Sequence, residues 1–317
     1  MGTLRNRNIA ALRMVSPPEV PSGLRRSSAA LPRVAGLHTS GRGSVSDSAG
    51  GMIGCFYRRL ADSDPDGDFQ AFSPTDYTRS NWGNIQHGSP PLALLTKLIE
   101  ELSAGSGLRI GRLSLDILGA IPVGPLRARA WVERPGSRVC MIVAEMHVDR
   151  DGGPARAAAR VTAWLLAVTD TTDVASDRYA PLVEGRAEPL AAIFADAGGY
   201  FDALKCRPQS TQGDSAAVSW FSPLAHIVDT EPTSALQRLA AVVDCANGVG
   251  AILDPSQFVY MNTDTVVHLH RLPAGNDFAL RARGSIGPDG VGVTTAEVFD
   301  QAGFIGTSAQ TLLIQRK

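Results

Sequence analysis

The chain has 317 residues, 44% of them hydrophobic and 19% charged, which is typical of a globular protein with about two domains. Residues 1–45 hold seven arginines and one acidic residue, so the rest of the chain, with 23 basic and 30 acidic residues, carries a net charge of −7. That sign argues against nucleic acid as a partner, because such proteins present a basic surface. No apolar run reaches the roughly 18 residues of a membrane-spanning helix.

Four widely separated cysteines form no C-x-x-C pair (Cys55, Cys140, Cys206 and Cys245). This spacing is typical of a reduced, intracellular protein and not of a disulfide framework or a zinc site. We therefore expect a cytoplasmic protein without a bound metal.

Residues 1–51 are rich in Arg, Ser, Pro and Gly and have no sustained apolar period. Such a segment cannot bury enough apolar surface to offset the entropy of ordering it, so we expect it to be disordered. Its Arg- and Ser-rich, acid-poor composition also resembles an organellar transit peptide. A third interpretation is a start site assigned too far upstream, with Met52 as the working start. The sequence leaves all three open.

The rest of the chain shows two similar runs of helix and strand signals. In the first, strand-like pieces precede a helix opened by Pro90–Pro91, and strand alternation then continues over 109–169. A polar, irregular segment follows over 169–189. The order then repeats, with strand-like pieces, a helix over Glu231–Leu253 and further strands.

The two runs also match in sequence. Glu145 precedes Glu297 by 152 positions, within the similar segments AEMHVDRDGG and AEVFDQAG. Repetition at a fixed spacing indicates an internal duplication. We therefore predict two tandem units, over residues 52–170 and 196–317, joined by a linker over 171–195.

Asp244 is the one charged side chain between Leu239 and Gly250 of the second predicted helix. We expect Thr230 to cap this helix, with Pro232 in its first turn. A helix that is apolar all round is buried, and a buried carboxylate needs a partner. Asp244 is therefore either satisfied by backbone or Arg contacts, or a general base in a dry cleft.

One long helix against an antiparallel sheet, repeated twice, is the hotdog arrangement. The chain resembles the double-hotdog acyl-CoA thioesterases of the type-II bacterial and peroxisomal group over about Cys55–Arg316. The segments that carry the resemblance are, in order, WGNIQHGSPPLALL, GRLSLDILGAIPVGPL with RPGSRV, NTDTVVHLHR and GTSAQTLLI. The resemblance implies an α+β double-hotdog fold, an acyl-CoA substrate and no cofactor.

In this family an Asp, a Thr or Ser, and a Gln hold the water that attacks the thioester. The resemblance places Asp244 and Gln310 at the first and last of these positions, and Asn262 stands where the Thr or Ser is usual. The first repeat carries Arg160 where Gln310 stands in the second, so we expect one active site per chain. The resemblance also implies that backbone N–H groups at His87-Gly88 polarise the thioester carbonyl.

Each candidate also has an ordinary structural interpretation. Gln310 fits a polar residue of an edge strand, Asn262 a strand-entry residue, and His87-Gly88 the end of a loop. His268 and His270 share a strand face, but without an evident third ligand a packing role is favoured over metal binding.

We therefore predict a thioesterase that hydrolyses fatty acyl-CoA to the free acid and CoA. Asp244 acts as general base on a water positioned by Asn262 and Gln310. The alternative is a non-catalytic acyl-CoA-binding protein that kept the fold, which the Asn at position 262 favours. Acyl-CoA is the expected partner, and the sequence leaves a homo-oligomer open.

Overall fold

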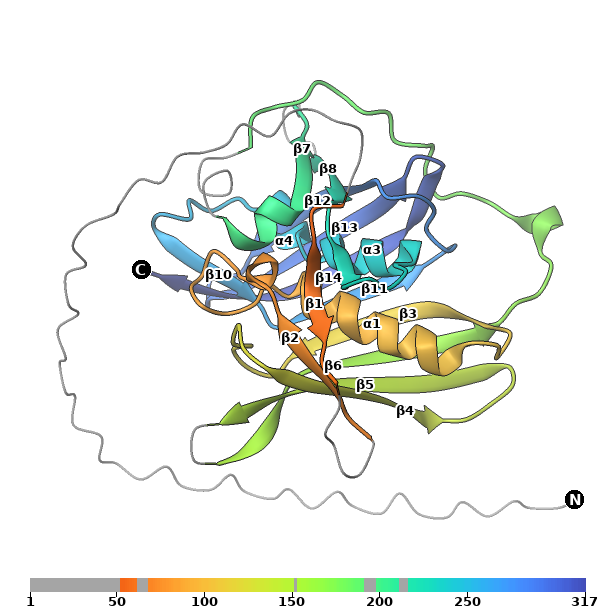
Figure 1. The fold of residues 1–317 in the computed structure, drawn as a ribbon. Coiled ribbons are helices and arrows are strands. Elements are labelled where there is room, and N and C mark those ends of the chain that lie inside the picture. Colours follow the sequence, from red (N-terminus) through yellow and green to blue (C-terminus); the bar gives the residue numbers. More distant parts are fainter. Residues whose placement is uncertain (1–51, 62–67, 151–152, 191–197, 211–215) are drawn as a thin grey trace, which may run out of the picture. The chain divides into compact units, whose positions relative to one another are not determined.

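The computed structural model describes residues 52–61, 68–150, 153–190, 198–210 and 216–317. Fourteen strands of this part join into one sheet, and two helices lie side by side against it (Figure 1). The segment expected to be disordered, residues 1–51, lies outside the described residues.

The first half of the sheet follows the predicted order of strands and helix. Its elements are β1 (Cys55–Arg59), β2 (Gln70–Pro74), η1 (Asp76–Thr78), α1 (Ser89–Ser103), β3 (Leu108–Ile117), β4 (Leu126–Arg134), β5 (Val139–Arg150) and β6 (Gly153–Ala167). Helix α1 begins with Ser89, so Pro90 and Pro91 fall in its first turn. There a missing N–H costs nothing, because those donors have no partner within the helix.

The second half repeats this order. Its elements are η2 (Thr172–Val174), η3 (Gly199–Ala203), β7 (Leu204–Pro208), β8 (Ala217–Pro223), β9 (His226–Val228), α3 (Ala235–Val243), α4 (Ala246–Val249), β10 (Phe258–Asn262), β11 (Asp264–Leu269), β12 (Phe278–Ile286), β13 (Val291–Asp300) and β14 (Gly303–Arg316).

The strand order of the sheet is symmetric about its centre. The order β7-β8-β12-β13-β14-β11 continues across the antiparallel β11–β3 pair into β3-β6-β5-β4-β2-β1, which is the same sequence of equivalent strands reversed. Each half is antiparallel and packs on its own helix, so the predicted double-hotdog fold is confirmed. Strand β9 of the second half pairs in parallel with β1 of the first. The proposed boundaries at 52–170, 171–195 and 196–317 stay a prediction.

The helices α1 and α3 pack against each other in opposite directions. Near the C-terminal end of α1, the Glu100 carboxylate accepts hydrogen bonds from Ser234 Oγ (2.8 Å) and Gln237 Nε2 (2.7 Å) at the start of α3. At the other end, Gly88 before α1 lies against Asp244 after α3. The first turns of α1 are buried on all sides, from Ser89 to Ile99, as expected for a helix between a sheet and a second helix.

The second helix is shorter than the predicted Glu231–Leu253 and is broken in two. Asp244 is the C-cap of α3, so it lies at the break before α4 and not inside a continuous helix. Thr230 was the wrong N-cap: its φ of 58° belongs to a turn, and Ser234 caps the helix by accepting the Gln237 N–H at 3.0 Å.

Candidate active site

The carboxylate of Asp244 is buried and held by side chains from the strands that follow it. The residue is 2% exposed, and its Oδ1 accepts hydrogen bonds from Asn262 Nδ2 (2.7 Å), Thr265 Oγ1 (2.5 Å) and Gln310 Nε2 (3.1 Å). The structure thus brings together the three residues predicted from the sequence and adds Thr265. Within the described ranges no Arg or Lys pairs with this carboxylate, so three uncharged donors offset its charge.

A break between β10 and β11 brings Asn262 and Thr265 to the same face of the sheet. Asn262 lies opposite Leu312 of β14, whereas Val266 lies opposite Ala309, so the register shifts by one residue between them. In a regular strand, side chains three residues apart face opposite sides. Because of the shift, the side chains of Asn262 and Thr265 both face the helices, as they would at a β-bulge. Sequence reasoning missed Thr265 because the shift leaves no signal in the local sequence.

Gln310 is buried in β14, which lies between β13 and β11, so the interpretation as an edge residue is wrong. Its Nε2 faces three acceptors: the main-chain oxygen of Asp244 (3.0 Å), the Asp244 carboxylate, and Thr265 Oγ1 (3.0 Å). These partners fix which end of the amide carries the nitrogen. The Gln310 Oε1 atom has no hydrogen-bond partner among the described residues.

The other carboxylate oxygen of Asp244, Oδ2, faces the first half of the chain. A Cβ atom on Gly88 would lie 2.5 Å from Oδ2, so this close approach requires glycine. His87 Nδ1 lies 3.5 Å from Oδ2 but accepts a hydrogen bond from the Ser89 N–H (3.2 Å), which places the ring proton on Nε2. Burial lowers the pKa of His87, against the opposing effect of Asp244. His87 is therefore a neutral ring, stacked on Tyr200 at 4.0 Å.

Few backbone donors are free where α1 begins. The His87 N–H donates to the Thr78 carbonyl oxygen (2.8 Å), the Ser89 N–H is taken by the His87 ring, and Pro90–Pro91 have none. The backbone role expected for His87 is therefore excluded by its own hydrogen bond. Among the described residues, no acceptor pairs with the Gly88 N–H.

The strand register corrects the expected counterpart of Gln310 in the first repeat. Glu145 lies opposite Arg160, whereas Glu297, its equivalent, lies opposite Thr307. Arg160 therefore corresponds to Thr307, and its guanidinium pairs with Glu145 on the outer side of the sheet.

The true counterparts of the site residues in the first half are apolar. Counted along the same registers, Ala163 stands for Gln310 and Leu113 stands for Thr265. Both are buried in the core and neither offers a hydrogen-bond donor. The expectation of a single site in the chain therefore rests on Ala163 and Leu113 and not on Arg160.

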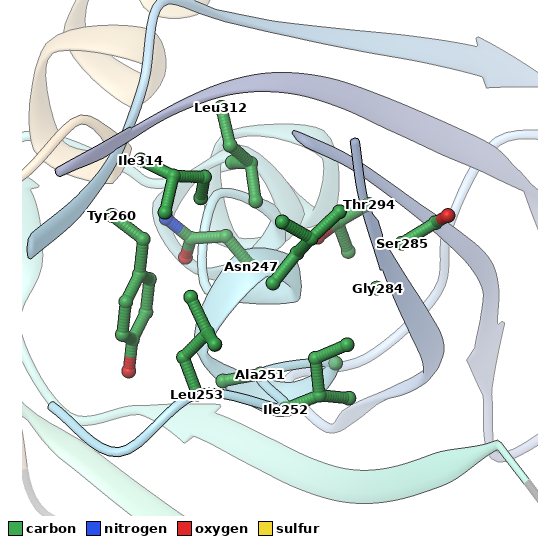
Figure 2. Close-up of a pocket in the computed structure, with 12 residues that line it drawn as sticks. Asn247, Ala251, Ile252, Leu253, Tyr260, Gly284, Ser285, Thr294, Leu312 and Ile314 are labelled. Atoms are coloured by element: carbon green, nitrogen blue, oxygen red, sulfur yellow. The ribbon is translucent and has the colours of Figure 1, made fainter. Parts of the chain in front are cut away.

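An apolar pocket begins beside this network. Asn247 Nδ2 donates to Asn262 Oδ1 (3.4 Å), and Asn247 also lines the pocket (Figure 2). Figure 2 shows Tyr260, Leu253 and Leu312 around it. Apolar surface therefore begins one hydrogen bond away from Asn262.

Further findings concern the described part of the chain. It holds no group of three His, Cys, Asp or Glu residues able to bind a metal, and no helix long and apolar enough to cross a membrane. His268 and His270 are both exposed, but the His270 ring lies against the Phe304 ring with centroids 5.7 Å apart, so the packing interpretation holds for His270. His270 Nε2 also contacts Asp177 Oδ1 at 3.0 Å.

Comparison with known proteins agrees with this fold. A family described as acyl-CoA thioesterase N-terminal domain matches residues 78–166, and the corresponding C-terminal domain matches residues 180–314. No curated protein sequence matches the chain.

Solved structures share the fold at low sequence identity. The chain is similar to a protein assigned as a thioesterase from Novosphingobium aromaticivorans, with 16% identity and a TM-score of 0.60 over 81% of this chain and 98% of that one. It is also similar to a hotdog protein of unknown function from Alicyclobacillus acidocaldarius, with 15% identity and a TM-score of 0.58 over 80% and 95%. A third is acyl-CoA thioesterase II TesB2 from Mycobacterium marinum, with 12% identity and a TM-score of 0.57 over 80% and 94%. With both of its domains matched in order and two hotdog halves in one sheet, this chain belongs to the double-hotdog acyl-CoA thioesterase family.

Proposed function

We propose that the chain hydrolyses fatty acyl-CoA thioesters to the free acid and CoA, with Asp244 as the general base. The observation that carries this proposal is the uneven use of the Asp244 carboxylate. Its Oδ1 accepts three hydrogen bonds, while Oδ2 faces Gly88 and a neutral His87. A base needs one oxygen that is free to take a proton, and Oδ2 meets that requirement.

The reaction then follows from the atoms around Oδ2. Water gives a proton to Asp244 as its oxygen bonds to the thioester carbon, and the Gly88 N–H donates to the carbonyl oxygen as negative charge develops there. Collapse of the tetrahedral intermediate breaks the C–S bond, and the proton held by Asp244 passes to the departing CoA sulfur. Asn262 and Gln310 orient the carboxylate through their N–H groups, and the unpaired Gln310 Oε1 is available to the second hydrogen of the water.

The acyl part of the substrate needs apolar surface near this point. The pocket that starts at Asn247 has apolar walls beside the Asn247–Asn262 hydrogen bond, but its volume of about 10 Å³ holds only one water, so an acyl chain enters it only if these side chains move apart. A cytoplasmic location, expected from the cysteine spacing, belongs to the same proposal.

A second candidate is an acyl-CoA-binding protein without turnover. It is favoured by Asn262, which stands where the family usually has Thr or Ser. Incubation with acyl-CoA esters of graded chain length, following release of free CoA thiol, separates the two. Binding without CoA release at every length would leave only the second candidate, and release that is lost in Asp244→Asn supports the first.

A further inference from the structure

Thr265 lies at the centre of the hydrogen-bond network around Asp244. It is fully buried, with 0% exposure. Its hydroxyl donates its one proton to Asp244 Oδ1 at 2.5 Å. Its oxygen accepts from Gln310 Nε2 at 3.0 Å and from Asn262 Nδ2 at 3.2 Å. One donor and two acceptor positions are all that a hydroxyl has, and here all three are used.

No other side chain in this network can make the same set of contacts. Asn262 and Gln310 present N–H groups, which donate but do not accept, so Thr265 is the one member that links both amides to each other and to the carboxylate. A hydrogen bond to an ionised carboxylate is also stronger than one between neutral groups. Losing the hydroxyl would leave both amides with one acceptor fewer.

The comparison between the two halves points the same way. Leu113 occupies the position of Thr265 in the first half, where the neighbouring residue is Ala163 in place of Gln310. A buried β-strand position in this fold is thus filled well by an aliphatic side chain when no carboxylate stands opposite. Packing alone does not require a hydroxyl there.

We propose that Thr265 is a positioning residue of the Asp244 site: its hydroxyl holds Oδ1 against the sheet, so that Oδ2 faces Gly88 and receives the proton from water. The proposal rests on the proposed function of Asp244 as a base. It also gives the chain a hydroxyl at the site although position 262 carries Asn.

The test compares three variants of the full chain. Thr265→Val keeps the shape and removes the hydroxyl, Thr265→Ser keeps the hydroxyl, and Thr265→Ala serves if the valine variant does not fold. Thr96→Val is the matched control, since Thr96 is also fully buried and its hydroxyl bonds only the Leu92 carbonyl oxygen at 2.7 Å, within α1. For each variant we measure thermal melting and the steady-state hydrolysis of the acyl-CoA ester that the wild type hydrolyses fastest.

We expect Thr265→Val to lower kcat about 10- to 100-fold, the range for losing a hydrogen bond to a charged group, with KM changed less than about threefold. Thr265→Ser should stay within about threefold of the wild type in kcat, and Thr96→Val should lose stability without losing kcat. Wild-type kcat in Thr265→Val, or no recovery in Thr265→Ser, would overturn the proposal.

A second measurement does not depend on turnover. Crystal structures of the wild type and Thr265→Val compare the rotation of the Asp244 carboxylate about its Cβ–Cγ bond. Without the Thr265 hydroxyl, Oδ1 loses its shortest hydrogen bond (2.5 Å), so we expect the carboxylate to rotate away from its wild-type position. An unchanged carboxylate would contradict the role of Thr265 even in an active enzyme. A rotated carboxylate in a chain that hydrolyses no acyl-CoA would instead reject the proposed function and leave the contact between Thr265 and Asp244 supported.

Discussion

Replacing Asp244 with Asn separates chemistry from folding at this site. The amide has the same shape as the carboxylate, so its oxygen can keep the place of Oδ1 and its nitrogen the place of Oδ2. There the nitrogen lies beside the Gly88 Cα and 3.5 Å from His87 Nδ1, an acceptor. The variant therefore fits the site but has no basic oxygen.

The stability change should be small. Three hydrogen bonds to a charged oxygen become neutral ones, a loss of about 0.5–2 kcal/mol each. Against this, the variant no longer buries a charge that has no cationic partner in the described chain, and that cost is several kcal/mol. The two effects oppose each other, so we expect the free energy of unfolding to change by less than about 2 kcal/mol, which corresponds to a few degrees in Tm.

The change in rate should be much larger. General base catalysis is worth about 10²–10⁴ in rate, which equals about 2.7–5.4 kcal/mol of transition-state stabilisation at 1.36 kcal/mol per factor of ten. Affinity for acyl-CoA should change little, because the carboxylate acts on the attacking water and not on the bound substrate.

Single-turnover hydrolysis and thermal melting on the same preparation check both numbers, with mass spectrometry to exclude deamidation of the new Asn back to Asp. An Asp244→Asn variant that is strongly destabilised yet hydrolyses acyl-CoA at the wild-type rate per folded molecule would refute the reasoning. Asp244 would then be a structural group in a buried network.

Three more outcomes follow from the structure. Gly88→Ala should cost about 10²-fold or more in kcat, because its Cβ would lie 2.5 Å from the Asp244 carboxylate while its φ of −68° suits alanine; steady-state kinetics and melting measure this. Asn262→Ala should lower kcat about 10- to 100-fold by removing one donor, and Asn262→Thr should give no gain over the wild type in the same assay. Glu231→Gln should destabilise the fold by about 1 kcal/mol at neutral pH, measured by denaturant unfolding, since Arg59 lowers the pKa of Glu231 to about 2 but solvent screens this partly exposed ion pair.

The sign of the last effect sets its pH range. The folded-state pKa of Glu231 lies below the ordinary value near 4.5, so the stabilisation is present above that value and is lost as the pH falls toward 2. Wild type and Glu231→Gln should therefore converge in stability between about pH 4.5 and 2. A constant difference down to pH 2 would contradict the assignment.

For Gly88→Ala, the control variant is Gly105→Ala, where φ is 76° and no atom lies within 4 Å of the added Cβ. This control should lower stability and leave kcat intact.

Local patterns predicted most of the fold because each strand and helix has its own period. The start of the second helix was mispredicted since two cap signals compete there. Thr230 and Pro232 form a good local signal, but the helix begins at Ser234, whose hydroxyl is also held by Glu100 of the other half. That contact joins residues 134 positions apart and cannot be seen in a local window.

The site was predicted where a residue type is unusual in its surroundings. Asp244 stands out in an apolar segment, and Gln310 and Asn262 followed from the family resemblance. Thr265 did not stand out, since threonine is ordinary in a strand and only the one-residue shift between β10 and β11 turns it toward the helices. The register also moved the equivalence of Arg160 from Gln310 to Thr307, because the hairpin that joins Glu145 to its partner strand is longer than the hairpin at Glu297.

The symmetry of the sheet has a consequence for how such a sequence can drift. Thr265 and Leu113 are the same position in two copies of one ancestral unit, as are Gln310 and Ala163. In one copy substitutions are limited by volume and shape, so any aliphatic side chain that fills the space can replace another. In the second copy, substitutions are limited instead by the positions that hydrogen-bond donors and acceptors must take around Asp244. Two stretches that began identical should therefore lose their likeness fastest around Asp244.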